Sequence, residues 1–389
     1  MALGVTSSTA LGDARAWRRV GLVLFAVGWG ANHFAALLLV YRERLALDAA
    51  APAMLLGMYA LGLVPGLLLA GPLSDRRGRR AVVLPSAVIA LVASCTLGAF
   101  GDSFVALLLG RLLYGLGAGG VMSAGAVWVI ELSRDAPGSG PRRATIAMSA
   151  GFGSGPLFSG LCAQYLPAPT VLSYVIHVAV LLAILCFAWH APNTGGSGAA
   201  GPLLRIELDR PAWWRFARGV APMAPFVFAF PMIAFVTLPA MLGGALGPAP
   251  MAYTGVLSAI TLATGVLVQP VTRRLEPATA ARLGLLVGAA GIGLGVLVIV
   301  THTPALLLVV APILGAAYGT CMTAGLQATQ RLARSDARGG ITGLYYVLTY
   351  VGFAAPYLLA LATRIAAPAV ALGVAAGLAV AAAAMLPRA

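Results

Sequence analysis

Two ionisable side chains, His33 and Arg111, stand inside long apolar runs of the sequence, where a charge is costly if the runs cross a membrane. His33 lies about 13 residues into its run, and Arg111 lies about six residues into its own. At about 1.5 Å per residue, His33 lies roughly 20 Å from one face of the membrane and Arg111 roughly 9 Å from the opposite face. In a hydrocarbon core about 30 Å thick, the two residues therefore lie at the same depth. With their neighbours Asn32 and Tyr114 they form a predicted polar site for a substrate or for protons.

The residue types define the chemistry that this site could perform. A histidine titrates near neutral pH, so His33 could carry a proton, whereas the guanidinium of Arg111 stays charged. All 11 acidic residues fall in loops or at the ends of apolar runs. A cationic substrate would therefore lack a counter-ion, and a neutral, amphipathic or anionic substrate facing Arg111 fits better. Each residue also has a structural interpretation, since Arg111 could hydrogen-bond helix ends, and His33, like His177, could be a neutral core histidine.

The composition is that of a membrane protein. Of the 389 residues 60% are hydrophobic and 9% are charged, against about 25% charged in a typical soluble protein. The net charge of +14 comes from arginines spread over short loops, which argues against nucleic-acid binding. The four cysteines lie in apolar runs without the spacing of metal ligands, so we expect neither a metal nor a cofactor.

Twelve apolar runs are long enough to cross a lipid bilayer as helices. They cover residues 17–41, 51–71, 81–100, 103–130, 143–166, 168–190, 218–242, 251–271, 281–300, 304–330, 340–362 and 365–387. The long break at 191–217 mixes Arg, Leu and Trp, so it is either a segment in the membrane interface or a plain linker. We therefore predict an all-α membrane protein with an N-terminal six-helix bundle (1–190), a cytoplasmic linker (191–217) and a C-terminal six-helix bundle (218–389).

The arginines predict the orientation, because cytoplasmic loops of membrane proteins hold most of the basic residues. With the N-terminus inside, 21 of the 25 arginines fall on the cytoplasmic side. Arg42, Arg44 and Arg364 fall on the outer side, and Arg111 lies within a run. Both termini are therefore predicted to be cytoplasmic.

The chain also repeats itself at an offset of about 200 residues. Residues 122–125 match 322–325, and Gly115 and Gly119 match Gly315 and Gly319. The two bundles are thus expected to be pseudo-symmetric copies. In such proteins the substrate site lies near the midplane between the copies, and rocking about that site gives alternating access.

The loop between the second and third runs carries the most specific motif. It reads Gly71-Pro72-Leu73-Ser74-Asp75-Arg76-Arg77-Gly78-Arg79-Arg80, which matches the loop signature G-x-L-x-D-R-x-G-R-R of the major facilitator superfamily. Arg111 opens an R-x-x-x-G-x-G sequence similar to the family's motif in helix 4. The fifth run resembles the motif of the family's antiporters through Gly151, Gly155, Pro156 and Gly160, with Ser159 in place of a glycine. The chain therefore resembles the twelve-helix drug:proton antiporter branch of this family.

The resemblance implies roles for these residues. A gating loop would comprise Gly71, Asp75, Arg76, Gly78, Arg79 and Arg80, and Asp75, Arg79 and Glu131 would form a charge cluster that holds the cytoplasmic side shut. Asp75 would face the positive N-terminus of helix 11 near Gly340 and Ile341. Helices 1, 4, 7 and 10 line the cavity in this family, so His33 and Arg111 are expected to face it. The alternatives are a loop that only sets topology and a glycine face of helix 5 that only packs.

The second half of the chain supplies aromatic residues and prolines. Tyr346, Tyr350, Phe353 and Tyr357 follow the spacing of one helix face. We predict that Tyr346 and Tyr350 contribute to the substrate site, with helix packing as the alternative. Four prolines between Pro222 and Pro239 predict kinks in helix 7 and a possible gate there.

These features predict a secondary active transporter in a bacterial-type inner (plasma) membrane, working as a monomer and exporting a drug-like or metabolite molecule with proton coupling. An uptake symporter or uniporter for a small organic acid is the first alternative. An intramembrane enzyme is a second, although the spans contain no HExxH, GxSxG or paired acidic motif. A non-transporting receptor or scaffold is a third, and it would need no intact gating loop.

Overall fold

The computed structural model describes residues 16–47, 51–133, 139–196, 210–332 and 338–387, and all regular structure in these ranges is helical. The first half forms α1 (Ala16–Arg44), α2 (Ala51–Arg77), α3 (Arg80–Ala99), α4 (Phe104–Gly120), η1 (Val121–Gly125), α5 (Ala126–Leu132), α6 (Ser139–Tyr165) and α7 (Pro169–Ala188). The second half forms α8 (Arg210–Gly219), α9 (Ala224–Met232), η2 (Ile233–Thr237), α10 (Leu238–Leu242), η3 (Gly243–Leu246), α11 (Pro250–Leu267), α12 (Gln269–Thr272), α13 (Pro277–Thr301), η4 (Pro304–Leu306), α14 (Leu307–Leu332), α15 (Arg338–Tyr350), η5 (Val351–Ala354), α16 (Ala355–Ala362) and α17 (Pro368–Met385).

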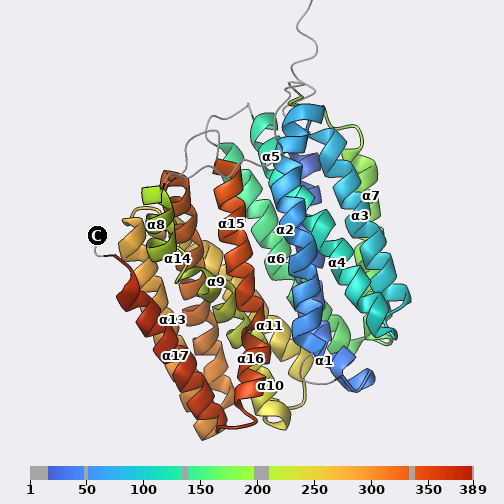
Figure 1. Ribbon diagram of the computed structural model, residues 1–389. Helices are drawn as coiled ribbons and strands as arrows, with labels where there is room; N and C mark the ends of the chain where they lie inside the picture. The colour runs from blue at the N-terminus through green and yellow to red at the C-terminus, as the bar shows by residue number, and fades with distance from the viewer. Residues whose placement is uncertain (1–15, 48–50, 134–138, 197–209, 333–337, 388–389) are drawn as a thin grey trace, which may run out of the picture.

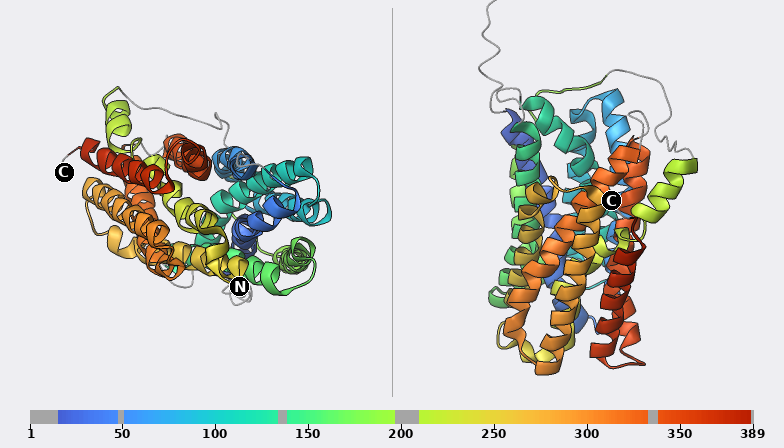
Figure 2. Two further views of the ribbon diagram at one scale, coloured as in Figure 1. Left: turned by 90° about the horizontal axis from the view of Figure 1, so that it is seen from below. Right: turned by 90° about the vertical axis from the view of Figure 1, so that its left-hand side faces the viewer.

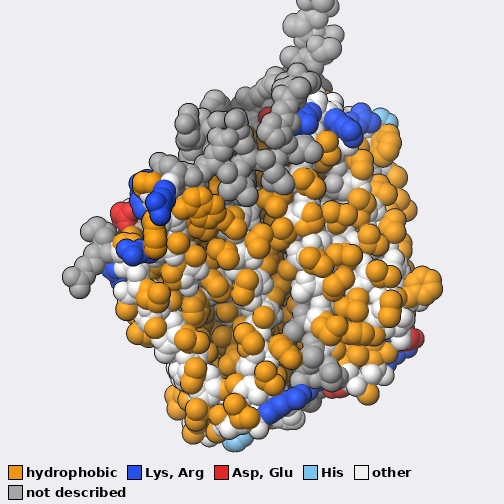
Figure 3. All heavy atoms as spheres, viewed as in Figure 1, with side chains coloured by type: hydrophobic (Ala, Val, Ile, Leu, Met, Phe, Trp, Pro, Cys, Tyr) orange, Lys and Arg blue, Asp and Glu red, His pale blue; other side chains and the backbone are white. Residues whose placement is uncertain are grey.

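Twelve helical spans in the described ranges are long and apolar enough to cross a membrane, as the sequence predicts. A bilayer core offers no water to the backbone, so each span satisfies its own N–H and C=O groups by forming a helix. The spans stand side by side in two bundles, with α1–α7 on one side and most of the later helices on the other (Figures 1 and 2). On the face shown in Figure 3, apolar side chains cover the middle, and charged ones gather near the two ends.

Glycines let helices approach closely within each bundle. A Cβ atom at Gly115 or Gly119 of α4 would collide with a carbonyl oxygen of α2. The repeat-related glycines of α14 do the same against α11, where Gly315 meets the carbonyl oxygen of Thr261. The glycines that reveal the internal repeat in the sequence therefore make equivalent helix contacts in the two halves, which is how small residues act in membrane interiors.

The two halves meet along two helix pairs. α6 packs against α11 where Gly160 lies beside Gly255, and a Cβ at Gly160 would lie 2.7 Å from the carbonyl oxygen of Met251. α2 packs against α15, where a Cβ at Gly343 would overlap the side chain of Leu68. Close contacts at glycines thus join the halves along both helix pairs.

Several spans are interrupted rather than continuous. Helix 7, for which kinks were predicted, is interrupted, because the π-helical turn η2 separates α9 from α10. A second π-helical turn, η1, divides the predicted fourth span, and the 3-10 turn η5 divides the eleventh. These breaks were not predicted for the fourth and eleventh spans. Each changes the helical phase, so residues on either side no longer follow one continuous face.

The break between the halves contains a short helix, α8, which precedes the seventh span. Its Trp213 and Trp214 are exposed, whereas Phe216 is buried. This distribution is compatible with the predicted interfacial segment. The division of the chain at 191–217 stays a prediction, and residues 197–209 of that stretch lie outside the described part.

The close approach of α6 to α1 can be tested at one glycine. A Cβ at Gly155 would collide with the carbonyl oxygen of Trp29, whereas the space around Gly153 on the same helix is open. We expect Gly155→Ala to lower the free energy of unfolding by about 1–3 kcal/mol through overpacking, and Gly153→Ala to leave it unchanged or slightly higher because Ala favours helix. Denaturant unfolding of the purified protein in detergent measures both. Equal effects of the two substitutions would contradict the packing described here.

Candidate functional site

Arg111 lies inside the N-terminal half and holds three helices together. Its Nε donates to the carbonyl oxygen of Leu55 in α2 at 3.3 Å, and its Nη1 donates to that of Ala31 in α1 at 3.3 Å. The guanidinium carbon lies 4.6 Å from the ring centroid of Phe34 and 4.4 Å from that of Tyr59. The group is therefore fixed by two carbonyls and two aromatic rings, an arrangement that suits a planar guanidinium.

His33 is fully buried in α1 among aromatic side chains of the same half. Its ring centroid lies 4.9 Å from that of Tyr174, 6.2 Å from that of Phe158 and 5.9 Å from that of His177. Neither ring nitrogen of His33 has a hydrogen-bond partner among the described residues. Most buried polar atoms do have partners, so His33 holds two unused positions for a proton or a hydrogen bond.

His177, by contrast, uses both ring nitrogens. Nε2 lies 3.0 Å from the carbonyl oxygen of Ala26, and Nδ1 lies 3.1 Å from Oγ of Ser94. A carbonyl oxygen only accepts, so Nε2 carries a proton and the Ser94 hydroxyl can donate to Nδ1. His177 is therefore a core histidine with hydrogen bonds at both ring nitrogens, in agreement with the structural interpretation of its sequence position.

The other members of the predicted polar site lie nearby. Tyr114 donates its hydroxyl to the carbonyl oxygen of Val27 at 3.0 Å, and its ring centroid lies 6.2 Å from that of His177. Asn32 is half-buried on α1. The structure thus brings His33, Tyr114 and Arg111 into one half of the molecule.

A cavity of about 290 Å³ lies between the two halves, beside the C-terminal end of α1 and the N-terminal ends of α2 and α17. Neither His33 nor Arg111 is among the described residues that line it, so in this conformation they do not face it as expected. Its wall is formed by Ala35, Leu38, Arg42, Pro52, Phe235, Val236, Thr237, Pro239, Ala240, Met241, Thr254, Pro356, Tyr357, Ala360, Thr363 and Pro368. The chain therefore offers a space between the halves that is mostly apolar and has one arginine at its rim.

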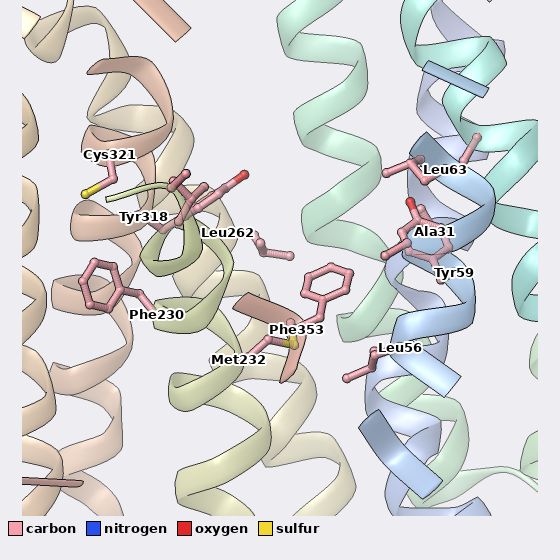
Figure 4. Close-up of a cluster of buried hydrophobic side chains, with 14 of the residues drawn as sticks. Ala31, Leu56, Tyr59, Leu63, Phe230, Met232, Leu262, Tyr318, Cys321 and Phe353 are labelled. Atoms are coloured by element: carbon pink, nitrogen blue, oxygen red, sulfur yellow. The ribbon is translucent and has the colours of Figure 1, made fainter. Parts of the chain in front are cut away.

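An aromatic layer fills the middle of the interface between the halves. The ring of Phe228 stacks on that of Tyr350 with centroids 4.8 Å apart, and lies 4.9 Å from Phe353. Phe353 in turn lies 6.5 Å from Tyr59 of the other half, and Figure 4 shows it between the two sets of helices, with Leu56 opposite. Aromatic rings thus form part of the contact between the halves.

The predicted stripe of helix 11 is divided by η5. Tyr350 and Phe353 belong to the aromatic layer, Tyr357 lines the cavity, and the ring of Tyr346 packs 5.8 Å from that of Tyr345. Phe228 was not among the residues predicted from the sequence. Arg42 was also missed, although it follows Ala35 and Leu38 at the i, i+3, i+7 spacing of one helix face.

The charge cluster implied by the loop motif is present. Nη1 of Arg79 lies 2.5 Å from Oδ1 of Asp75, and its Nη2 lies 2.9 Å from Oε1 of Glu131. Nη1 also donates to Oγ of Ser74 at 2.6 Å, and Thr194 donates to Oε2 of Glu131 at 2.5 Å. Arg79 is 8% exposed, whereas the Asp75 side chain is 60% exposed, so a buried arginine joins the loop, the end of α5 and the segment that follows α7.

The remaining loop residues shape this junction. Gly78 has φ of +91°, which favours glycine, and a Cβ there would collide with the side-chain amide of Asn193. The backbone N–H of Arg80 donates to Oδ1 of Asn193 at 3.0 Å, and the Arg80 guanidinium lies 5.8 Å from the ring centroid of Trp189. Gly71 lies close to Ser123 of η1, and Arg76 is half-buried.

The predicted contact of Asp75 with the start of helix 11 stays a prediction. α15 begins at Arg338 and packs against α2, and Ile341 is buried. The surroundings of residues 338–340, including Gly340, lie outside the described part of the structure.

The glycines of the antiporter-type motif divide their contacts between two partners. Gly151 and Gly155 of α6 face carbonyl oxygens of α1, whereas Gly160 faces α11 of the other half. Pro156 lies between them, and its carbonyl oxygen would be 2.7 Å from a Cβ at Gly255. One face of α6 therefore anchors the helix within its own half, and another face places it against the other half.

The fixed geometry of Arg111 gives a test. Lysine keeps the charge but cannot donate to two separate carbonyls while lying flat between two rings. We expect Arg111→Lys to lower the free energy of unfolding by about 2 kcal/mol or more, nearly as much as Arg111→Ala, because each charge-assisted bond contributes about 1.5–3 kcal/mol. The exposed Arg364→Lys is the control. A Lys variant with wild-type stability and transport would show that charge alone is needed at this position.

Comparisons with known proteins extend this description. The family model of the Major Facilitator Superfamily matches residues 20–357. A glucose transporter, GlcP, from Staphylococcus epidermidis is 30% identical over 98 residues, which is 25% of this chain and 22% of that protein. The chain thus matches about a fifth of the length of that relative.

Solved transporter structures share the fold. A POT family transporter in complex with 5-aminolevulinic acid superposes with a TM-score of 0.77 at 11% identity, covering 95% of each chain. The nucleoside transporter NupG superposes with a TM-score of 0.72 at 14% identity, covering 96% of this chain and 100% of its own. A peptide transporter in complex with sulfate gives 0.70 at 15% identity, covering 95% and 93%. With a family match over most of its length and this architecture, the chain belongs to the Major Facilitator Superfamily.

Proposed function

We propose that the protein is a proton-coupled exporter of a small drug-like or metabolite molecule, working by alternating access as a monomer in a bacterial-type plasma membrane. Family membership and the transporter structures support a secondary transporter. The cavity between the halves is the observation that carries the proposal. It is wide enough for a small organic molecule, and its two walls belong to different bundles, so rocking of the bundles would expose it to either side in turn.

The interface between the halves supports such motion. Its middle is an aromatic layer, and the described hydrogen bonds that cross it are those of the Gln164 side chain, to the carbonyl oxygen of Pro248 and from the N–H of Met251. Contacts of this kind can be remade at low cost because few polar groups lose partners. The aromatic layer would then act as a gate on the route between the cavity and the cytoplasm.

The coupling proton is assigned to His33. Among the described residues no carboxylate is buried within a span, since Asp75, Glu131 and Glu276 lie at helix ends or beside them. His33 is buried at 0% exposure and has two unused ring nitrogens. A histidine in this position could bind a proton in the state that admits water and release it in the other.

An uptake symporter or uniporter for a small organic acid is the second candidate. Arg42 at the rim of the cavity favours it, because an arginine attracts anions. Counterflow of a labelled substrate in proteoliposomes, with and without a pH gradient, separates the two. Export by proton exchange requires accumulation driven by the gradient, whereas a uniporter shows counterflow that ignores it.

The charge cluster is proposed as the lock on the cytoplasmic side. Asp75→Asn would weaken it, since the proposed attraction of the Asp75 carboxylate to the positive N-terminus of α15 in the other half would be lost. We expect a shift toward the inward-open state, seen as longer distances between spin labels at Arg142 of α6 and Arg331 of α14 by double electron–electron resonance. Arg77→Gln, on the same loop but exposed, is the control. Unchanged distances with unchanged transport would remove the cluster from the gating mechanism.

The proton assignment is tested by His33→Gln, which keeps the size of the side chain and removes its titration. We expect substrate binding and substrate exchange to persist, and accumulation driven by a pH gradient to be lost. His190→Gln changes an exposed histidine and should have no effect. Gradient-driven transport that survives in His33→Gln would place the proton site elsewhere, and wild-type transport that ignores the gradient would refute coupling itself.

A further inference from the structure

Arg42 stands at the rim of the cavity with its charge unmatched among the described residues. It lies near the end of α1, on the face that also carries Ala35 and Leu38 to the cavity wall. Its guanidinium makes no described hydrogen bond or ion pair. Arg44, two residues on, is engaged differently, since its Nε lies 2.9 Å from Oδ1 of Asp102 and its Nη1 donates to Thr170 at 3.0 Å.

The threonine hydroxyls of the cavity wall already donate hydrogen bonds within the protein. The hydroxyls of Thr237, Thr254 and Thr363 donate to carbonyl oxygens of their own helices, at 3.3, 2.8 and 2.8 Å. The donors left for a ligand are the guanidinium of Arg42 and the hydroxyl of Tyr357. No described residue that lines the cavity carries a carboxylate. A cavity wall with free hydrogen-bond donors and no carboxylate favours a ligand that carries hydrogen-bond acceptors.

The rest of the wall is apolar. Leu38, Phe235, Val236 and Met241 come from both halves and surround a space of about 290 Å³. Such a wall gains free energy when it removes an aryl or alkyl body from water. The site therefore has an apolar chamber with a single cationic group at one side.

We propose that this cavity binds an amphipathic organic monoanion, in which a carboxylate is attached to a compact aryl or alkyl body. The carboxylate pairs with the guanidinium of Arg42 in the bidentate geometry that arginine favours, and the apolar body lies against Leu38 and Met241. A cation of the same shape is repelled by Arg42, and a neutral amide loses the charge-assisted bonds. The inference rests on the proposed function, because it names the substrate class of the same cavity.

The test uses three probes of one shape: 4-phenylbutanoate, 4-phenylbutanamide and 4-phenylbutylamine. Their affinities for the purified full-length protein are measured at neutral pH by equilibrium dialysis, with thermal unfolding as a check on folding. Arg42→Gln is compared with Arg364→Gln, which removes a charge from the same predicted side but not from the cavity wall. We expect the wild type to prefer the carboxylate over the amide by about tenfold, the effect of one charge-assisted contact.

We expect Arg42→Gln to abolish this preference without loss of thermal stability, and Arg364→Gln to retain it. Equal binding of carboxylate and amide by the wild type would overturn the assignment, as would a preference that survives in Arg42→Gln. Failure to bind any of the probes would also overturn it. Transport is measured independently of binding, as counterflow of 4-phenylbutanoate in proteoliposomes. Binding with the predicted dependence on Arg42 but without counterflow would refute transport while leaving the anion site in place.

Discussion

Close approach of helix backbones is the constraint on which this structure depends. Inside a bilayer, apolar side chains gain little by leaving lipid for protein, so helices associate through tight packing and a few polar contacts. In both halves glycines supply that packing, Gly115 and Gly119 against α2 and Gly315 and Gly319 against α11. The same closeness brings the carbonyl oxygens of α1 and α2 within reach of Arg111. A bulkier residue in these helix contacts would separate the helices and leave that buried cation without acceptors.

The two kinds of contact in the molecule have different mechanical consequences. Within the N-terminal half, Arg111 and the Arg79 cluster tie several helices through charged hydrogen bonds, which are strong and directional. Between the halves, the described contacts are mainly glycine faces and aromatic rings such as Phe353 and Tyr59. An N-terminal bundle tied internally by charged hydrogen bonds, with few polar contacts to the other bundle, could move as one body about the cavity between them. This division of contacts would give the proposed alternating access its physical basis.

Much of the fold follows from the sequence because length and apolarity alone define a membrane helix. The twelve spans, the repeat-related glycines and the cluster of Asp75, Arg79 and Glu131 were all predicted, and each lies where the motifs indicate. Which neighbour or cavity an individual side chain points toward was harder to predict. The depth of a residue in the membrane follows from its position along the helix. The rotation of the helix about its axis depends on the neighbouring helices, and a helix that is apolar all round carries no sequence pattern that reveals this rotation.

His33 and Arg111 show this limit. Both were expected at the cavity, yet His33 packs among Tyr174, Phe158 and His177, and Arg111 bonds to the backbone of adjacent helices. The turn η5 likewise divides the aromatic stripe that a continuous helix would have kept on one face. Such breaks depend on how helices pack around prolines and small residues, and single-sequence periodicity does not contain that information.

Access to the cavity from each side of the membrane tests the central claim most directly. A single cysteine at Ala35, in a chain whose four native cysteines are replaced by alanine, lies in the cavity wall. A membrane-impermeant maleimide is applied to one side at a time, in sealed vesicles of known orientation. The account predicts that this cysteine reacts from both sides, with the rate from the cytoplasmic side rising when Asp75 is replaced by Asn. Reaction from the outer side alone, in both backgrounds, would show that the cavity never opens inward and would contradict transport by alternating access.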